Sequence, residues 1–541
     1  MKNVQTWQEK LNALLDCDLK SLFPLAREQN RKLYFYVGPT NSGKTYRAME
    51  ELKEADCGMY LAPLRLLALE NYENLLADEI PVSLITGEEE ILDEEAGHIC
   101  STIEMTNYSL EVDVCVIDEV QMMGDPDRGW AWVNAIVGAP AEKVLMTGSV
   151  NALDAIKQIA EYLGEELEIV KFKRINPLEM LTHATPMKHI TLNTAIIAFS
   201  RAEVLRIKSQ LSKNHKVSVL YGNLSPEVRR EEAKRFREGK SDVLVATDAI
   251  AMGLNLPIQT LLFSADSKYD GVETRKLIPN EIIQIAGRAG RYGHHENGYI
   301  GATDPKILAH IDKMFHAPLH TIKPPFQVKA TTSQVLDLAQ HLKTDNLFKI
   351  LNYFSKHMNF DGPFVAANIG YMLDLAVMLD EKKKLTLEEK YMLAGAPVSI
   401  RSPLIKSAFF FYVDSILKRK VVRYKTSVST TGTAKTQLEL LKAEDEVKKI
   451  SLYLWMAYKF SELFPDSKMA EAARIKVNQY CEASLKSNKE LKAPKRRRRR
   501  NNPKHHDTYK KRNNGRNTGG KREEKEDKKD GTRQPRRRRR R

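Results

Sequence analysis

Short apolar segments rich in β-branched and aromatic residues alternate with longer segments of helical periodicity between about residues 31 and 304. This alternation is typical of parallel β-sheets covered by helices. The span is too long for one such sheet, and the alternation weakens near residues 168–189. We therefore predict two α/β domains, at residues 31–168 and 169–305. Strands are expected at residues 32–37, 58–61, 112–117, 143–146, 194–199, 216–220, 242–246 and 260–264.

The flanking regions have different patterns. Residues 1–30 are expected to form a short helical segment. From residue 306 to 490 apolar positions recur at spacings of three and four, as at Leu338 and Leu342, which predicts an all-helical domain. Residues 491–541 contain nothing that can form a core, so a disordered tail is expected. The predicted fold class is α/β in two tandem domains, followed by a helical domain and this tail.

The net charge of +15 is concentrated in that tail. Residues 491–541 hold 24 Lys and Arg against 6 Asp and Glu, whereas the preceding 490 residues hold 61 against 64. Two arginine runs, 496–500 and 536–541, account for much of the excess. Such runs neutralise phosphates without reading sequence, so we interpret the tail as a nucleic-acid anchor. The alternative is a solvated extension that serves solubility.

Composition also limits the cellular setting. The five cysteines are scattered, which excludes a disulfide scaffold and a zinc ribbon and fits a reducing compartment. No apolar run approaches the ~20 residues needed to cross a bilayer, so no membrane association is expected. No arginine precedes Arg27, which predicts neither a secretory signal nor a transit peptide. We expect a cytoplasmic protein.

The first chemical motif is GPTNSGKT at residues 38–45, between a predicted strand and a helical segment. This is the phosphate-loop pattern, in which backbone N–H groups surround the phosphates. Lys44 is expected to neutralise the β- and γ-phosphates, and the hydroxyl of Thr45 to bind Mg²⁺. The residues expected to bind the nucleotide here are Gly38, Thr40, Asn41, Ser42, Gly43, Lys44 and Thr45.

Two acids follow the apolar strand at residues 112–117. They place carboxylates at the carboxyl edge of the sheet, beside the phosphate loop. Asp118 is expected to hold Mg²⁺ through water, and Glu119 to polarise the attacking water. Together with the loop, these acids predict a nucleoside triphosphatase that uses ATP and Mg²⁺.

The second domain contains QIAGRAGR at residues 284–291, which matches an element of superfamily 2 helicases at all five defining positions. Charge develops on the γ-phosphoryl group during hydrolysis, and arginines from a second domain stabilise it once the cleft closes. Arg288 and Arg291 are the candidates, with Gln284 orienting the water together with Glu119.

Further short motifs occur in order between these two elements. Each is weak alone, because Thr-Gly and Thr-Asp pairs are usually turns or caps. Small hydroxyl residues and exposed N–H groups can grip a strand's phosphates without reading its bases. The expected nucleic-acid contacts are Arg65, Thr86, Gly87, Thr102, Thr247 and Asp248.

The stretch from residue 38 to 291 resembles superfamily 2 DExH-type helicases. Within them it is most similar to the mitochondrial degradosome RNA helicase family, which also has bacterial members, and Gln121 replaces the usual His. The helical region with LAGAPV at residues 393–398 also resembles that family. The resemblance implies two RecA-like domains, ATP-dependent unwinding of RNA duplexes and an RNA-degrading exonuclease as partner. We expect a bacterial member in the cytoplasm.

The resemblance also implies roles for single residues. Gln121, Thr147 and Ser149 would link the nucleotide state to the grip on the strand. Gly253 and Asn255, in the segment that resembles motif V, would contact the nucleotide.

Three functions stay open at this stage. The first is an RNA helicase working on single-stranded and duplex RNA in RNA turnover. The second is a helicase or translocase on DNA or RNA/DNA hybrids, since phosphate contacts do not report the 2′-OH. The third is an ATP-driven remodeller of nucleoprotein without unwinding. A hairpin is expected at residues 269–271, between strands at 260–264 and 272–277, as a wedge or as a plain connection.

Overall fold

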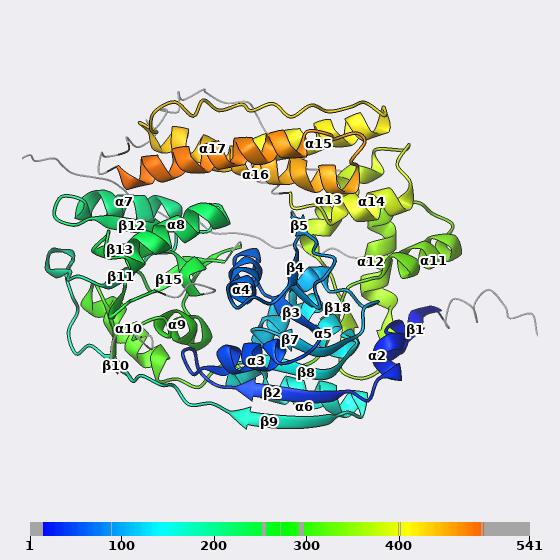
Figure 1. The fold of residues 1–541 in the computed structure, drawn as a ribbon, viewed down its shortest axis with the longest axis horizontal. Helices are drawn as coiled ribbons and strands as arrows, with labels where there is room; N and C mark the ends of the chain where they lie inside the picture. Colours follow the sequence, from blue (N-terminus) through cyan, green and yellow to red (C-terminus); the bar gives the residue numbers. More distant parts are fainter. Residues whose placement is uncertain are drawn as a thin grey trace, which may run out of the picture. The chain divides into compact units, whose positions relative to one another are not determined.

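The computed structural model describes residues 14–87, 89–251, 256–270, 272–290, 297–398, 400, 402–487 and 491. All of them belong to one compact unit, residues 1–494. Figure 1 shows two β-sheets with their helices and a set of helices from the carboxyl-terminal part of that unit. The tail, predicted to be disordered, lies outside the described residues.

The first sheet has eight strands in the order β5-β4-β6-β3-β7-β8-β2-β9. Its neighbouring strands pair in parallel except β4 and β5. Parallel pairing places the carboxyl ends of the strands at one edge, where ligands bind in open α/β sheets. The strands are β2 Lys32–Val37, β3 Gly58–Ala62, β4 Val82–Ile85, β5 Glu90–Ile91, β6 His98–Thr102, β7 Val112–Ile117, β8 Ala141–Gly148 and β9 Glu166–Lys171.

Helices cover both faces of this sheet, because side chains along each strand alternate between its faces. Phe35 of β2 packs with Trp132 in one core cluster, while the adjacent Tyr36 packs with Ala48 in another. The first cluster involves α5 and α6, and the second involves α3 and α4. Their bounds are α3 Lys44–Lys53, α4 Arg65–Ala77, α5 Gly129–Gly138 and α6 Leu153–Leu163.

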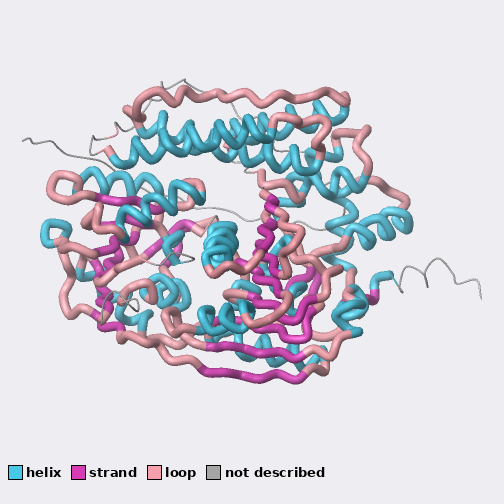
Figure 2. The backbone as a smooth tube through the Cα atoms, in the orientation of Figure 1, coloured by secondary structure: helices cyan, strands magenta, loops and turns pink. Residues whose placement is uncertain are grey.

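The second sheet has six strands, all parallel, in the order β10-β17-β14-β11-β13-β12. Figure 2 shows its strands and those of the first sheet as separate groups. The strands are β10 Leu178–Met180, β11 Thr194–Ile197, β12 Val217–Leu220, β13 Val243–Ala246, β14 Thr260–Phe263 and β17 Gly298–Ala302. The helices are α7 Arg201–Leu211, α8 Pro226–Arg237, α9 Pro279–Ala286 and α10 Pro305–Phe315.

The carboxyl-terminal part is mainly helical, and polar caps mark where its helices begin. Thr331, Asn346, Thr386 and Thr436 each accept a hydrogen bond from a backbone N–H in the first helical turn. Helix α17 packs on α8 and β12 of the second domain. The helices are α11 Thr332–Leu342, α12 Leu347–His357, α13 Gly370–Asp380, α14 Leu387–Ala394, α15 Pro403–Leu417, α16 Gln437–Lys459 and α17 Ser467–Lys486.

Short elements complete the unit. Before the first sheet the structure has β1 Asp16–Cys17, a 3₁₀ helix η1 Leu19–Leu22 and α2 Pro24–Glu28. Strand β18 Phe326–Val328 pairs with β20 Phe364–Ala366, and β1 pairs with β19 Asn359–Phe360. Strands β18, β19 and β20 interrupt residues 306–490, which were expected to be all-helical.

The expected fold class is confirmed, and a strand forms at each of the eight predicted positions. The predicted boundary at residue 168 lies inside β9, which still pairs with β2 of the first sheet. The hairpin is formed by β15 Ser267–Tyr269 and β16 Thr274–Lys276, whereas residues 260–263 belong to the central sheet. The apolar run at 260–264 therefore marked a buried strand and not a hairpin arm. Among the described residues, no helix is long and apolar enough to span a bilayer.

Candidate nucleotide and nucleic-acid sites

The loop between β2 and α3 has the geometry that phosphate binding requires. Gly43 has a φ of +82°, which side chains rarely adopt, and α3 begins at the next residue, Lys44. Helix N-termini direct backbone N–H groups and a positive dipole end at a bound anion. The Nζ of Lys44 donates to the carbonyl oxygen of Pro39 at 3.3 Å and is held inside the loop.

Asp118 lies at the end of β7, where three hydroxyl groups meet its carboxylate. Thr45 Oγ1 and Tyr60 OH each donate to it at 3.1 Å, and Thr147 Oγ1 donates to the same oxygen as Thr45. Only 3% of Asp118 is exposed, and burial, followed by the charge of Glu119, raises its pKa. A carboxylate beside the Thr45 hydroxyl supplies the hard oxygen ligands that Mg²⁺ prefers. The donor set therefore fits this ion.

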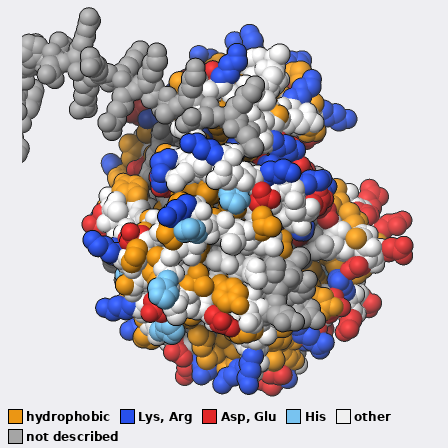
Figure 3. Space-filling model, turned by 90° about the vertical axis from the view of Figure 1, so that its left-hand side faces the viewer, with side chains coloured by type: hydrophobic (Ala, Val, Ile, Leu, Met, Phe, Trp, Pro, Cys, Tyr) orange, Lys and Arg blue, Asp and Glu red, His pale blue; other side chains and the backbone are white. Residues whose placement is uncertain are grey.

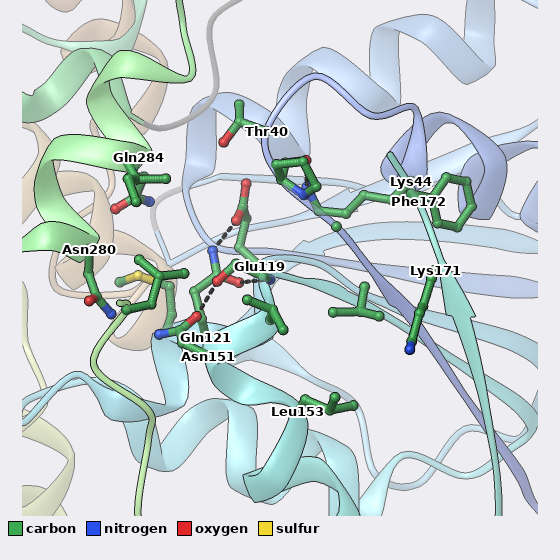
Figure 4. A pocket seen from close by; sticks show the side chains of 18 residues that line it. Thr40, Lys44, Glu119, Gln121, Asn151, Leu153, Lys171, Phe172, Asn280 and Gln284 are labelled. Carbon is green, nitrogen blue, oxygen red and sulfur yellow. Dashed lines mark hydrogen bonds between the residues drawn. The ribbon is translucent and has the colours of Figure 1, made fainter. Parts of the chain in front are cut away.

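A chain of polar groups continues from the second acid (Figure 4). Gln121 donates to the carboxylate of Glu119, and its own carbonyl oxygen accepts from the backbone N–H of Ser149 at 3.2 Å. Ser149 in turn donates to Asn151. Glu119 has a left-handed backbone, with φ 56° and ψ 49°, a strained conformation that clusters at functional sites. The structure thus joins Glu119 to all the predicted coupling residues: Thr147 Oγ1 accepts from the N–H of Glu119 at 3.3 Å.

A cavity of about 490 Å³ lies between these groups and the second domain. Figure 4 shows Gln284 and Asn280 on α9 facing Thr40 and Glu119 across it. Its lining also includes Gly38, Lys44, Gln121, Ser149, Leu153, Lys171, Phe172 and Leu319. The cavity is therefore lined by residues of the phosphate loop, by the predicted coupling residues Gln121 and Ser149, and by the predicted glutamine of the second domain, Gln284.

The sequence analysis missed one wall of this cavity. Leu319 belongs to a segment that bonds to both domains: His320 exchanges two hydrogen bonds with Asn280, at 2.8 and 2.9 Å. The N–H of Ile322 donates to the carbonyl oxygen of Asn151 at 2.9 Å. Tyr60, the third hydroxyl at Asp118, was also missed. Neither belongs to a motif, because both act through contacts between segments that are distant in the sequence.

The arginine element of the second domain touches the phosphate loop directly. A Cβ added to Gly287 would lie 2.7 Å from Cβ of Thr40, so only glycine fits there. Asn41 Nδ2 donates to the carbonyl oxygen of Gly290 at 3.0 Å. Arg288 is 5% exposed, and its guanidinium donates to the carbonyl oxygen of Ala251 while burial lowers its pKa. Arg291, Gly253 and Asn255 lie outside the described residues.

The predicted nucleic-acid contacts lie at the carboxyl ends of strands in both sheets. Arg65 follows β3, Thr86 follows β4, and Thr247 follows β13. The other predicted contacts occupy equivalent ends: Gly87 after β4, Thr102 at the end of β6 and Asp248 after β13. A second cavity, of about 600 Å³, is lined by Thr247, Asp248 and Gln284 among others. Gln284 therefore lines both cavities.

Arg65 is engaged by acids. Its guanidinium lies 2.6 Å from a carboxylate oxygen of Glu89 and 3.6 Å from one of Glu227 in the second domain. Glu227 also lies 3.8 Å from Arg474 of α17. Burial raises the pKa of Glu227, but the charges of Arg65 and Arg474 bring it below its usual range. One carboxylate thus joins three parts of the chain.

The cations of the hairpin are paired within the protein. Lys268 contacts Asp248 at 3.2 Å and Glu281 at 2.8 Å, Arg275 contacts Glu281 at 2.8 Å, and Lys276 pairs with Asp266. Burial raises the pKa of Glu281, but hydrogen bonds from Arg275 and Lys268 bring it to about 2. The hairpin is thereby fastened to α9, the helix that carries Gln284.

Trp132 has a packing role. It is fully buried, and its indole N–H donates to the carbonyl oxygen of Asp118 at 2.9 Å.

Figure 3 shows one outer face of the molecule, where Lys, Arg, Asp and Glu side chains are interspersed with hydrophobic ones. That mixture agrees with the nearly balanced charge of residues 1–490.

Four family models match the chain. They are the DEXQ-box helicase domain of Suv3 at residues 20–172, the helicase conserved C-terminal domain at 176–293, the Suv3 C-terminal domain 1 at 374–415 and the ATP-dependent RNA helicase SUV3 C-terminal domain at 440–487. The Arabidopsis thaliana mitochondrial helicase DExH16 is 33% identical over 88% of this chain and 84% of its own length. The chain belongs to the SUV3 family of ATP-dependent RNA helicases.

Other SUV3-family relatives are longer. The Arabidopsis thaliana mitochondrial helicase DExH18 is 34% identical over 86% of this chain and 60% of its own length. Saccharomyces cerevisiae mitochondrial SUV3 is 32% identical over 83% and 64% respectively. The chain thus spans less than two thirds of these two relatives.

One sequence-based expectation is wrong. We expected a bacterial cytoplasmic protein, whereas the SUV3-family relatives compared are named as mitochondrial proteins. The expectation rested on the absence of an arginine-rich leader pattern near Met1.

Proposed function

We propose that this SUV3-family chain hydrolyses ATP to move along single-stranded RNA and separate duplexes, in RNA turnover. The observation that carries the proposal is the cavity bounded by the phosphate loop, Glu119 and Gln284 of the second domain. Family membership favours RNA over DNA, since the relatives are named RNA helicases.

Each residue has a chemical task in this proposal. Lys44 provides a fixed cation for the β- and γ-phosphates, and the loop N–H groups complete their cradle. Glu119 accepts a proton from the attacking water, which Gln284 orients. Arg288, brought by the second domain and joined by Arg291, stabilises charge that develops on the transferred phosphoryl group.

Thr45 and Asp118 would hold Mg²⁺, the latter through water. When bound, this ion supplies positive charge that neutralises the phosphate oxygens. The hydrogen bonds from Tyr60 and Thr147 orient the Asp118 carboxylate for that task.

Nucleotide state would reach the RNA through two connections. The Glu119–Gln121–Ser149 chain links the catalytic acid to the end of β8, and Gln284 lines both the nucleotide cavity and the second cavity. The phosphate contacts would come from Arg65, Thr86, Gly87 and Thr102 on the first domain and from Thr247 and Asp248 on the second. An RNA-degrading exonuclease is the partner that the family resemblance implies, and co-purification would test it.

Strand displacement tests the proposed function. RNA, DNA and hybrid duplexes that share one sequence and one single-stranded overhang are compared with ATP, with a non-hydrolysable analogue and with the Glu119→Gln variant. We expect ATP-dependent separation of the RNA duplex by the wild-type chain alone. Faster separation of DNA would favour the DNA helicase, and ATP hydrolysis without separation of any duplex would favour a nucleoprotein remodeller.

A further inference from the structure

Arg174 lies between the last strand of the first sheet, β9, and the first strand in sequence of the second, β10. Among the described residues, its guanidinium donates only to backbone carbonyl oxygens. Nε donates to Asn176 at 2.7 Å, and Nη1 donates to Thr40 at 2.7 Å and to Gly287 at 3.1 Å. Nη2 donates to Ala289. The family models end at residue 172 and begin again at 176, so this residue falls between them.

The carbonyls come from both domains. Thr40 belongs to the phosphate loop, whereas Gly287 and Ala289 flank Arg288 in the arginine element. One planar guanidinium therefore spans the two structures that must meet around the γ-phosphate. A planar fork with fixed N–H directions suits this geometry, which a flexible ammonium cannot reproduce.

The charge of Arg174 lies in an unusual setting. Burial first, and the neighbouring charge of Arg288 second, lower its pKa to about 10. Within the described part of the chain, all its hydrogen-bond partners are neutral carbonyl oxygens and no carboxylate forms an ion pair with it. Carbonyl dipoles solvate a buried cation without cancelling its charge, so the positive field persists at the phosphate end of the cavity.

We propose that Arg174 is a positioning residue for ATP hydrolysis, which clamps the arginine element onto the phosphate loop and so sets the place of Arg288 at the γ-phosphate. This inference rests on the proposed ATPase function. The close contact of Gly287 with Thr40 and the bond from Asn41 to Gly290 show that the clamped surfaces already fit. Small displacements of a catalytic group cost rate steeply, by about a hundredfold for 1 Å.

The alternative is a purely structural staple, and the chain contains a comparable example. Arg31 donates to the carbonyl oxygens of Ile136, Val137 and Ala139, at 2.6, 2.8 and 3.0 Å. Unlike Arg174, it also lies 3.3 Å from a carboxylate oxygen of Glu165. Burial likewise lowers its pKa to about 10. Its partners lie within the first domain and away from the cavity. A structural role for Arg174 predicts that Arg174 and Arg31 respond alike to substitution.

The experiment compares Arg174→Gln, Arg174→Lys and Arg31→Gln with the wild-type chain. It measures kcat and KM for RNA-stimulated ATP hydrolysis, the Tm, and the Kd for ADP with and without aluminium fluoride, which mimics the transferred phosphoryl group. For Arg174→Gln we expect kcat to fall by about 10- to 100-fold. The Kd for ADP should change by less than about threefold, and the Kd with aluminium fluoride should rise by at least about tenfold.

The two comparison variants separate the explanations. Arg174→Lys keeps the charge but not the fork, so we expect partial recovery of kcat. Arg31→Gln should lower the Tm while kcat, measured below that Tm, stays at the wild-type value. Wild-type kcat and aluminium fluoride affinity in Arg174→Gln would overturn the proposal, as would losses that follow Tm equally in both glutamine variants. Absence of ATP hydrolysis by the wild-type chain would overturn this inference together with the proposed function.

Discussion

The candidate nucleotide site and the proposed nucleic-acid side of the molecule hold their cations in different ways. In the nucleotide cleft, Lys44, Arg174 and Arg288 donate to backbone carbonyl oxygens. On the nucleic-acid side, Arg65 and Lys268 are bound by carboxylates. The first arrangement orients a cation and keeps its charge, whereas the second neutralises it.

This difference has a functional consequence. A triphosphate that enters the cleft meets positive charge that no neighbouring acid cancels fully. The triphosphate therefore need not displace a carboxylate from these cations. A nucleic-acid phosphate must compete with carboxylates for the same cations, which reduces the affinity but lets binding rearrange contacts between domains. Glu227 contacts both Arg65 and Arg474, and Glu281 contacts the hairpin. An exchange of ion-pair partners on nucleic-acid binding would therefore affect both α17, which carries Arg474, and the hairpin.

The largest expected effect concerns the nucleotide side. Lys44→Ala should lower ATP turnover by at least about a hundredfold, because the β- and γ-phosphates lose a fixed cation in a site with little water. Steady-state hydrolysis at saturating RNA measures this. Lys53→Ala, which removes two ion pairs at the far end of the same helix, serves as the control and should stay near wild type. Near-wild-type hydrolysis by Lys44→Ala would refute the site.

A moderate effect is expected at the hairpin. Glu281→Gln removes the acid that fastens Lys268 and Arg275 to α9. The pKa of Glu281 is lowered to about 2, so its carboxylate is charged at neutral pH. The stability that this carboxylate contributes is lost only as the pH falls from the pKa of Glu281 in the unfolded chain towards 2. Strand separation should slow by roughly fivefold, equivalent to about 1 kcal/mol, with a smaller change in ATP hydrolysis.

Glu273→Gln is the control for that experiment, because Glu273 lies in the same hairpin and none of the described residues forms an ion pair with its side chain. Equal losses of unwinding and hydrolysis in Glu281→Gln would mean that the carboxylate supports the catalytic helix and not the hairpin. Wild-type unwinding would show that the hairpin needs no fastening.

The smallest expected effect tests the neutralised cations directly. Glu227→Gln should tighten RNA binding by about two- to threefold at low salt, since Arg65 and Arg474 lose one competing charge. The gain should fade as salt rises. Glu73→Gln is the matched control: it breaks an ion pair with Arg230 between the same two helices, α4 and α8, where both side chains are more exposed. Weaker binding by Glu227→Gln would contradict the exchange of partners.

The sequence predicted the nucleotide site better than the nucleic-acid side. The phosphate loop, Asp118 and Glu119 follow buried strands, so position in the sheet followed from local pattern. Gln121, Thr147 and Ser149, which the family resemblance grouped as coupling residues, are joined by hydrogen bonds through Glu119 and Gln121. The ion pairing of Arg65 and Lys268 could not be predicted, because the acids that bind them come from other segments of the chain. Arg174 belongs to no pattern, since its partners are backbone carbonyls that every residue has.

Domain boundaries and short strands were harder to predict, because the segments that form them lack continuous apolar runs. Strand β9 is exposed at alternate positions and lies at the sheet edge, so it lacks the continuous apolar run that marked β7. Its pairing with β2 places the first sheet's end at Lys171, three residues beyond the predicted boundary. The hairpin strands carry ion pairs rather than apolar side chains, which hid their bounds as well.

We propose that the nucleotide cleft and the nucleic-acid side belong to one motor. This is tested by the rate of ATP hydrolysis with no nucleic acid, with single-stranded RNA and with single-stranded DNA of the same sequence and length, at matched salt. We expect a rise of at least about tenfold with RNA, equivalent to about 1.4 kcal/mol of coupling, and less with DNA. A rate that is the same in all three conditions would contradict it.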